Sequence, residues 1–279
     1  MKSIKYNNGN SGQALIIIVL MIALVLTVIA ASSYQLTVQT EGSKLQEESV
    51  RALAAADAGI EAGLQIANTE SAPQTYTFES QGINLAGIDA TRSEIIVTTP
   101  SRSDFVSSLV PKDDQFTFYT AAFPEYPAPS FDGSLTIFFG SEGAGNCSSR
   151  STPALELTFI SGVGNSVQHR LVEPCTPPGQ LIEGTSLTVS ATPVTVGDVT
   201  FNYQVQAIDM NSFPDAKMII VRPLFGSTRL RFLAGAGQSF PNQGKLIESR
   251  SYSISGPSKI VTIFQSLPQL PADFFVTSF

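Results

Sequence analysis

One uninterrupted stretch, residues 13–67, restricts the fold of this chain more than any other. It contains no proline, since the first proline of the chain is Pro73. Residues 14–31 are Ala, Leu, Ile, Val and Met with Thr27 as the one polar member, and within the stretch no charge occurs before Glu41. Charged residues then appear among alanines as far as Glu61. The simplest prediction is one continuous helix, about 80 Å long, that is hydrophobic in its first half and amphipathic in its second.

The apolar residues 14–31 have the length and composition of a membrane-spanning helix. They would form about 27 Å of helix, close to the hydrocarbon thickness of a bilayer. Lys2 and Lys5 precede this segment, so the positive-inside rule predicts a cytoplasmic N-terminus and about 240 residues outside the cytoplasmic membrane. Two simpler interpretations remain open at this point. One is a secretory signal cleaved near Ala30-Ala31-Ser32-Ser33, and the other is a plain single-span anchor.

The second half of the predicted helix carries two stripes of side chains. An apolar stripe recurs at spacings of three and four residues: Leu53, Ala56, Ile60, Leu64 and Ala67. A second stripe consists of small residues: Ala52, Ala56, Gly59 and Gly63. Small residues allow another backbone to approach closely. Both stripes could pack on the globular part of the same protein or against another helix. Glu47 precedes Arg51 by four residues, which predicts an ion pair on the helix surface.

A family resemblance links the two halves of this helix. It is carried by a short basic leader ending in Gly12, an apolar helix without a stop, and the segment Arg51-Ala-Leu-Ala-Ala-Ala-Asp-Ala-Gly-Ile-Glu61. Residues 9 to about 70 thereby resemble the N-terminus of type IV pilus minor pilins of the PilX type. In that family the corresponding pattern is approximately Arg-Ala-x-x-Ala-Ala-x-Ala-Gly-Ile-Glu.

The resemblance implies a structural protein of a pilus. Prepilin peptidase would cleave between Gly12 and Gln13, and the helix would leave membrane lipid to pack with other pilin subunits in a filament at the cell surface. Gln13 stands where the family more often has an apolar residue. Ile17 stands where major pilins carry a glutamate and PilX-type minor pilins commonly do not. The resemblance therefore implies a minor pilin or pseudopilin.

The remaining sequence predicts a β-rich domain after the helix. All 17 prolines and most of the 21 glycines lie from Pro73 onward, a distribution typical of strands joined by turns. We therefore expect an α+β chain with a leader at 1–12, a helix at 13–70 and an extracytoplasmic β-rich, sandwich-like domain at 71–279; two small domains are the alternative. Charged residues make up 14% of the chain and the net charge is −7, which argues against a nucleic-acid partner.

Period-2 patterns and short apolar runs predict the individual strands. They lie at 76–79, 94–99, 115–121, 134–139, 155–159, 167–172, 201–207, 218–221, 228–233, 247–254 and 259–265. We expect a loop or short helix at 101–114 and the end of a central strand at Arg222-Pro223. Leu230 and Phe232 should face the core, with Arg229 and Arg231 outward. The apolar tail 267–279 should dock on the domain.

The two cysteines, Cys147 and Cys175, bracket the predicted hairpin of 155–159 and 167–172. On the outer side of a membrane we expect them to form a disulfide that closes the base of this hairpin. The alternative is two buried free thiols. A metal site is disfavoured because the only histidine, His169, would leave a tetrahedral site one ligand short.

No set of residues in the sequence predicts enzymatic chemistry. There is no Gly-x-Ser-x-Gly motif and no cluster with the spacing of metal ligands. His169 is expected to be a surface or hydrogen-bonded residue. The acids Glu156, Glu173, Asp198, Asp209 and Asp215 are scattered. We therefore expect a non-enzymatic protein without a cofactor. The alternative to a pilin is an uncleaved, membrane-anchored binding domain for a surface partner or glycan.

Overall fold

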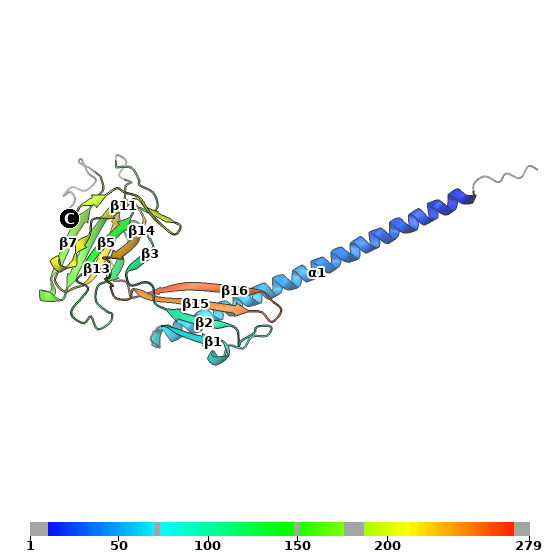
Figure 1. Cartoon of the computed structure of the whole chain (residues 1–279), viewed down its shortest axis with the longest axis horizontal. Helices are drawn as coiled ribbons and strands as arrows, with labels where there is room; N and C mark the ends of the chain where they lie inside the picture. Colours follow the sequence, from blue (N-terminus) through cyan, green and yellow to red (C-terminus); the bar gives the residue numbers. More distant parts are fainter. Residues whose placement is uncertain (1–10, 70–72, 148–150, 176–186, 271–279) are drawn as a thin grey trace, which may run out of the picture. The chain divides into compact units, whose positions relative to one another are not determined.

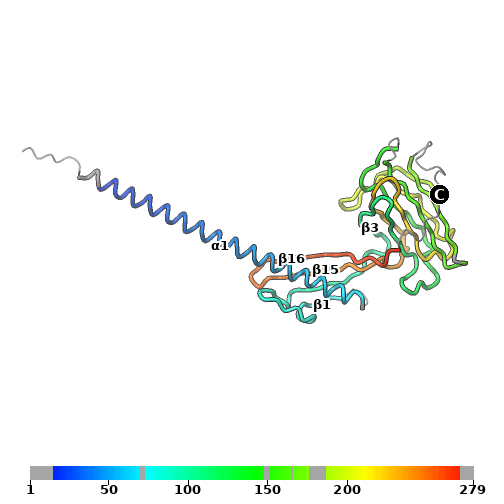
Figure 2. The backbone as a smooth tube through the Cα atoms, turned by 180° about the vertical axis from the view of Figure 1, so that it is seen from behind, coloured from blue at the N-terminus to red at the C-terminus, as the bar shows by residue number. Residues whose placement is uncertain are grey.

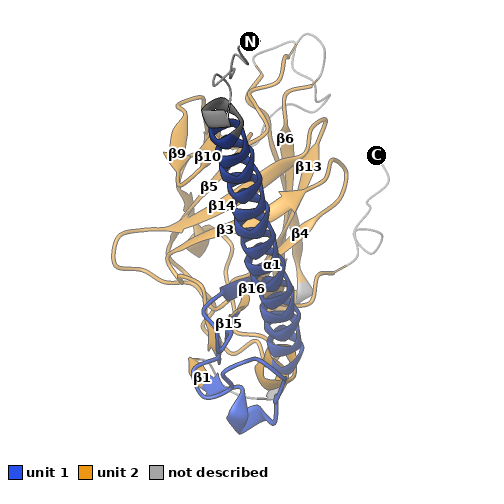
Figure 3. Ribbon diagram, turned by 90° about the vertical axis from the view of Figure 1, so that its right-hand side faces the viewer, with its two compact units in different colours: residues 1–62, 76–95, 249–261 blue, residues 63–75, 96–248, 262–279 orange. Residues whose placement is uncertain are grey.

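The structure is a computed structural model that describes residues 11–69, 73–147, 151–175 and 187–270. These residues fall into two compact units, which Figure 3 colours separately. The first unit contains residues up to 62 together with 76–95 and 249–261, and the second contains 63–75, 96–248 and 262–279. Among the described residues, one long helix precedes sixteen strands, so the chain is α+β as predicted.

Helix α1 runs from Ser11 to Thr69 without a break, as Figure 1 shows. The predicted continuous helix is therefore confirmed, while residues 1–10 of the predicted leader lie outside the described residues. Polar side chains in its first half bond to the helix itself. The hydroxyls of Thr27 and Ser32 donate to the carbonyls of Leu24 and Val28 at 2.8 and 2.9 Å. Such bonds satisfy a hydroxyl without water.

Four strands that are distant in sequence form one sheet in the order β1-β2-β15-β16. Their bounds are β1 Gln74–Thr77, β2 Glu94–Thr98, β15 Gly244–Tyr252 and β16 Ser258–Ser266. A 3-10 helix, Glu79–Gln81, follows β1. The backbone tube of Figure 2 shows β15 and β16 as a hairpin, which agrees with the pair predicted around Gly256-Pro257.

Two further sheets lie within the second unit. The larger has the order β3-β14-β5-β11-β8, with β12 paired to β5: β3 Asp104–Val110, β14 Thr228–Ala234, β5 Ser134–Phe139, β11 Tyr203–Val205, β8 Val189–Ser190 and β12 Ile208–Asp209. The other has the order β4-β13-β6-β7: β4 Phe116–Tyr119, β13 Ala216–Leu224, β6 Ala154–Ser161 and β7 Val167–Val172. A separate ribbon pairs β9 Val194–Val196 with β10 Val199–Phe201, and 3-10 turns occur at Val163–Asn165 and Met210–Ser212.

These two sheets pack face to face around one hydrophobic core. Side chains of β3, β5 and β14 from one sheet and of β4, β6 and β13 from the other form a single buried cluster. The rings of Phe118 on β4 and Phe232 on β14 stack with centroids 4.0 Å apart. Leu155, Leu157 and Phe159 of β6 enter the same core, as their alternation predicted. The predicted sandwich-like architecture is thus present in the second unit.

The prediction of a loop or short helix at 101–114 is wrong, because β3 occupies Asp104–Val110 and pairs with β14. The two serines at positions 107 and 108 interrupt the apolar pattern from which the other strands were predicted. The hydroxyl of the buried Ser107 accepts a hydrogen bond from the backbone N–H of Leu230 at 3.0 Å, at the point where the register between the two strands shifts. A side-chain oxygen therefore replaces a backbone acceptor at this irregularity.

Two predicted strand boundaries are also wrong. The strand expected at 201–207 breaks at Asn202, because β10 pairs with β9 whereas β11 pairs with β5 and β8. The Asn202 side chain donates to the Gly140 carbonyl at 2.7 Å. Strand β13 continues past Arg222-Pro223 to Leu224. Proline is tolerated there because the ladder with β4 ends at the pair of Val221 with Phe116. Beyond it the Pro223 carbonyl accepts a hydrogen bond from the backbone N–H of Asp113 at 2.8 Å, a bond that needs no N–H of the proline.

Arg231 was expected to face outward, but it is buried in the structure. Leu230 and Phe232 are fully buried and Arg229 is exposed, as predicted. Arg231, however, is only 9% exposed. Its Nε and one terminal nitrogen each donate to a carboxylate oxygen of Asp104 at 2.8 Å, and its guanidinium lies 4.7 Å from the centre of the Phe138 ring. A bidentate partner and a ring compensate the burial of this charge.

The start of the predicted C-terminal tail docks on β4. The Tyr119 hydroxyl donates to the Pro268 carbonyl at 2.5 Å, and the Thr117 N–H donates to Gln269 Oε1 at 2.6 Å. The rest of the tail, residues 271–279, lies outside the described residues.

Candidate functional surface on the N-terminal helix

The first half of α1 is exposed on every side. All residues from Leu15 to Val38 are classed as exposed, and the large apolar side chains among them keep about half or more of their surface accessible; Ile17 is 60% and Val25 53% exposed. The most apolar 18 residues of the helix have a mean hydropathy of 3.1, and the helix is long enough to cross a membrane. Exposed apolar surface of this extent indicates a surface that another apolar phase or another protein covers. The structure thus supports membrane anchoring by this helix.

The second half of α1 is different, because one side of it is buried. Buried positions recur along it at Ala52, Ala55, Ala56, Gly59, Ile60, Gly63, Ile66 and Ala67. In the first unit, Phe78 and Ile95 are also fully buried. Figures 1 and 2 show this part of the helix alongside the sheet. The structure therefore places the small-residue stripe inside the protein's own fold.

At Gly59, helix and sheet approach closely in the first unit. A Cβ atom at this position would overlap Ser249 Oγ and would lie 2.8 Å from two ring atoms of Phe78. The hydroxyls of Ser249 and Ser251, both fully buried, have no hydrogen-bond partner within the described part of the chain. The small side chain of Ser249 fits opposite a helix residue that has no side chain.

The six residues proposed for helix packing therefore have different environments. Ala56, Gly59, Ile60 and Gly63 are buried, Leu64 is half-buried, and Leu53 remains 44% exposed. The predicted ion pair between Glu47 and Arg51 is present on the exposed side. The sequence pattern thus located the correct segment, but the small stripe, rather than the leucines, forms its buried side.

Two side chains of the second unit bind the last turn of α1. Lys245 Nζ donates to the Ala67 carbonyl, and Gln265 Nε2 donates to Asn68 Oδ1 at 3.1 Å. A cation at the C-terminal end of a helix satisfies a free carbonyl and complements the helix dipole. No signal within the helix sequence indicated these partners, because both come from strands about 180 residues or more away.

The predicted disulfide between Cys147 and Cys175 is confirmed. The two Cα atoms are 5.7 Å apart, and the bond joins residues separated by 28 positions. Cys147 precedes β6 and Cys175 follows β7, which pair with each other. The bond therefore closes the base of the β6–β7 hairpin.

His169 on β7 lies in a small polar cluster on β6, β7 and β13. Its Nδ1 is 3.0 Å from the Thr158 hydroxyl and 3.9 Å from Glu156 Oε1, while Glu156 Oε2 is 3.6 Å from Arg222. This agrees with the prediction of a hydrogen-bonded histidine. Within the described ranges, no group of three or more His, Cys, Asp or Glu residues could hold a metal ion.

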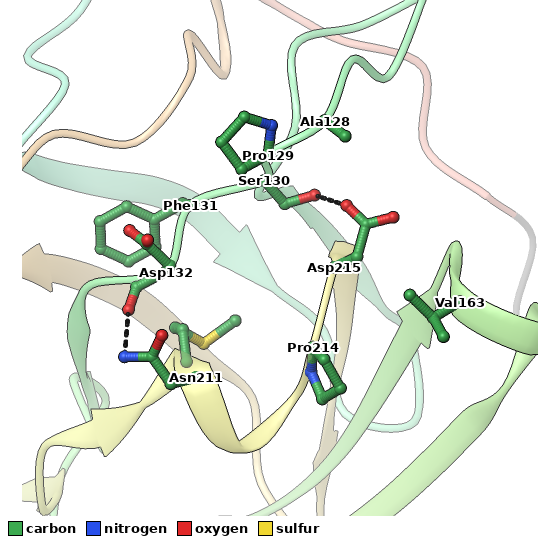
Figure 4. Close-up of a pocket in the computed structure, with 10 residues that line it drawn as sticks. Ala128, Pro129, Ser130, Phe131, Asp132, Val163, Asn211, Pro214 and Asp215 are labelled. Carbon is green, nitrogen blue, oxygen red and sulfur yellow. Dashed lines mark hydrogen bonds between the residues drawn. The ribbon is translucent and has the colours of Figure 1, made fainter.

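A cavity of about 590 Å³ opens on the second unit (Figure 4). It is lined by Ala128–Asp132, Val163 and residues of the Met210–Asp215 segment. The Ser130 hydroxyl donates to Asp215 at 2.9 Å, and Asn211 Nδ2 donates to the Asp132 carbonyl at 3.0 Å. Lys217 Nζ lies 2.5 Å from Asp215 Oδ1. The hydrogen bond from Lys217, supported by that from Ser130, holds the pKa of the Asp215 carboxyl below its usual value. Asp215 is thus a carboxylate at the rim of the cavity that is paired with Lys217 and Ser130.

Comparison with known proteins adds no relative. No protein-family model matches the chain, and searches of curated proteins and of solved structures found no match to it.

Proposed function

We propose that the chain is a non-enzymatic structural subunit, a minor pilin or pseudopilin of a type IV pilus-like filament. The observation that carries this proposal is the division of α1 into an all-round exposed apolar half and a half packed in its own fold. A single-span anchor requires only the apolar segment. A helix that continues without a break into the globular fold would also hold that fold at a fixed position on a filament of packed helices.

The same helix suits both stages of assembly. In the membrane its helical backbone is hydrogen-bonded within the segment, and the hydroxyls of Thr27, Ser32, Thr37 and Thr40 bond to its own carbonyls. In a filament, helices of other subunits would replace the lipid around Leu15–Val38. Because an all-round apolar surface fits lipid and neighbouring helices alike, neither environment requires a polar side.

Processing at the N-terminus provides the test. We expect the protein isolated from a host with its own prepilin peptidase to begin at Gln13, as measured by N-terminal sequencing and intact mass. Gly12→Val should block this cleavage and leave membrane insertion intact. The matched control Gly9→Val lies outside the cleavage position and should be processed normally. A mature Gly12→Val protein that still lacks the first 12 residues would contradict the proposal.

The alternative function is an uncleaved, membrane-anchored domain that binds a surface partner or glycan. The cavity lined by Asp132, Asn211 and Asp215 favours it, because carboxylates, amides and backbone groups are the hydrogen-bonding partners of sugar hydroxyls. An intact Met1 in the membrane protein, together with glycan binding that Asn211→Ala abolishes, would support this alternative over the pilin.

A further inference from the structure

Strand β16 is the edge of its sheet. In the order β1-β2-β15-β16, β15 is its only hydrogen-bonded neighbour within the described residues. The strand is nine residues long, with the sequence Ser258-Lys-Ile-Val-Thr-Ile-Phe-Gln-Ser266. Exposure alternates strictly along it, and Ile260, Thr262 and Phe264 belong to the exposed set. Ile260 is 60% and Phe264 37% exposed.

This edge lacks the features that usually protect edge strands. Proteins keep free edges short, or place proline, bulges or several charges on them, because a long apolar edge offers unpaired N–H and C=O groups to another strand. Strand β16 contains no proline, and Lys259 is its single charged residue. The opposite edge of the same sheet, β1, has only four residues, Gln74–Thr77. Of the two edges of this sheet, only β16 is thus long and unprotected.

The sequence of β16 is complementary to itself in the antiparallel direction. When the strand is aligned with a reversed copy about Thr262, each residue faces one of similar character. The facing pairs are Ser258 with Ser266, Lys259 with Gln265, Ile260 with Phe264, Val261 with Ile263, and Thr262 with itself. No like charges meet, and β-branched and aromatic residues oppose one another, which is a favourable cross-strand combination.

We propose that β16 pairs antiparallel with β16 of a second copy of this chain, centred on Thr262. The two-fold symmetry of such a pair makes the interface self-complementary, and each strand supplies the hydrogen-bonding groups that the other lacks. The contact extends the sheet by strand addition. Because α1 lies along this sheet (Figures 1 and 2), the two-fold axis of an antiparallel pair points the two α1 helices in opposite directions, so the two copies would belong to facing membranes or filaments. The contact does not depend on cleavage after Gly12.

Cysteine cross-linking of the full chain in detergent tests this pairing. Both native cysteines are in the disulfide, so one introduced cysteine is the only free thiol. Directly opposed residues in an antiparallel pair have Cα atoms about 4.5–5.5 Å apart, within disulfide reach. We expect Thr262→Cys to form a covalent dimer under mild oxidation at a level at least tenfold above Ile260→Cys or Phe264→Cys alone.

The two flanking variants are matched controls for register. In the proposed pair, two copies of residue 260 are four residues apart along the strands, about 13 Å, and cannot link. Co-expressed Ile260→Cys and Phe264→Cys chains should instead link to each other. Equal cross-linking of all three single variants would indicate parallel pairing or collision through the helices and would overturn the proposal. A monomeric Thr262→Cys, or its capture by a different protein, would also overturn it.

Discussion

Gly59 on α1 and Ser249 on β15 lie so close together that a single methyl group at position 59 would overlap the serine hydroxyl. This contact sets the distance between helix and sheet in the first unit. It explains why an alanine-rich stretch of the helix has glycine at a buried position, where alanine would otherwise be the better helix former.

Gly59→Ala should therefore lower the free energy of unfolding by about 1–3 kcal/mol, because overlap with Ser249 and Phe78 outweighs the gain of about 1 kcal/mol in helix propensity. Denaturant unfolding of the detergent-solubilised chain, followed by near-UV circular dichroism, measures the change. Gly42→Ala is the matched control, since nothing lies within 4 Å of a Cβ there; it should be neutral or stabilising. Ser249→Ala should partly rescue Gly59→Ala, and strict additivity of the two changes would rule out the contact as the cause.

The paired variant Cys147→Ser/Cys175→Ser should lose roughly 3.5 kcal/mol of stability in the chain-entropy model, because the disulfide closes a loop of 28 positions. The measurement is the midpoint of urea unfolding at constant m-value. Reducing agent should shift the wild-type midpoint by the same amount and leave the variant unaffected. A wild-type midpoint that does not respond to reduction would show that the bond contributes little.

Asp215 should give the second unit an acid-sensitive contribution to stability. Its pKa is lowered in the folded state by Lys217 and Ser130. The ionised form therefore stabilises the fold at every pH above the unfolded value of about 3.9, and this stabilisation is lost as the pH falls through that value toward the lowered pKa. The difference in melting temperature between wild type and Asp215→Asn should be constant from pH 5 to 7 and shrink below pH 4. A difference that does not depend on pH would contradict the ion pair as its source.

A charge in the exposed apolar half of α1 should impair anchoring or assembly and leave the β-rich units folded. Val25→Asp places a carboxylate near the middle of the apolar segment, at a cost of about 2.5–3.5 kcal/mol for a membrane helix centre. Membrane fractionation and co-purification with filaments would report the loss, and near-UV circular dichroism should be unchanged. Leu45→Asp is the control, since Leu45 is 54% exposed on the same helix beyond the uncharged segment. Equal incorporation of the two variants into filaments would argue against the pilin proposal.

The strands that could be predicted from sequence are those whose own residues alternate between apolar and polar. In β5, β6 and β14 the alternation of apolar and polar residues itself records which side faces the core, so neighbours in sequence suffice to place them. The same holds for α1, whose composition fixes both its helicity and its apolar half. The disulfide was also predictable, because two cysteines bracketing one hairpin meet when the hairpin forms.

Other features depend on residues that are remote in sequence. Ser107 of β3 is buried and accepts a hydrogen bond from the Leu230 N–H. Arg231 is buried because Asp104 and Phe138 on the neighbouring strands contact its guanidinium. The sequence around Ser107 or Arg231 does not show which remote residue will contact it.

Helix α1 shows most clearly which features depend on local sequence and which depend on remote residues. Its sequence determined that residues 13–67 form one helix with an apolar half and a half bearing two stripes of side chains. Only the tertiary structure decided which stripe is buried, namely the small residues around Gly59 rather than Leu53. The physical reason is that a local pattern fixes the direction of each side chain along a helix, whereas burial depends on how closely another element can approach.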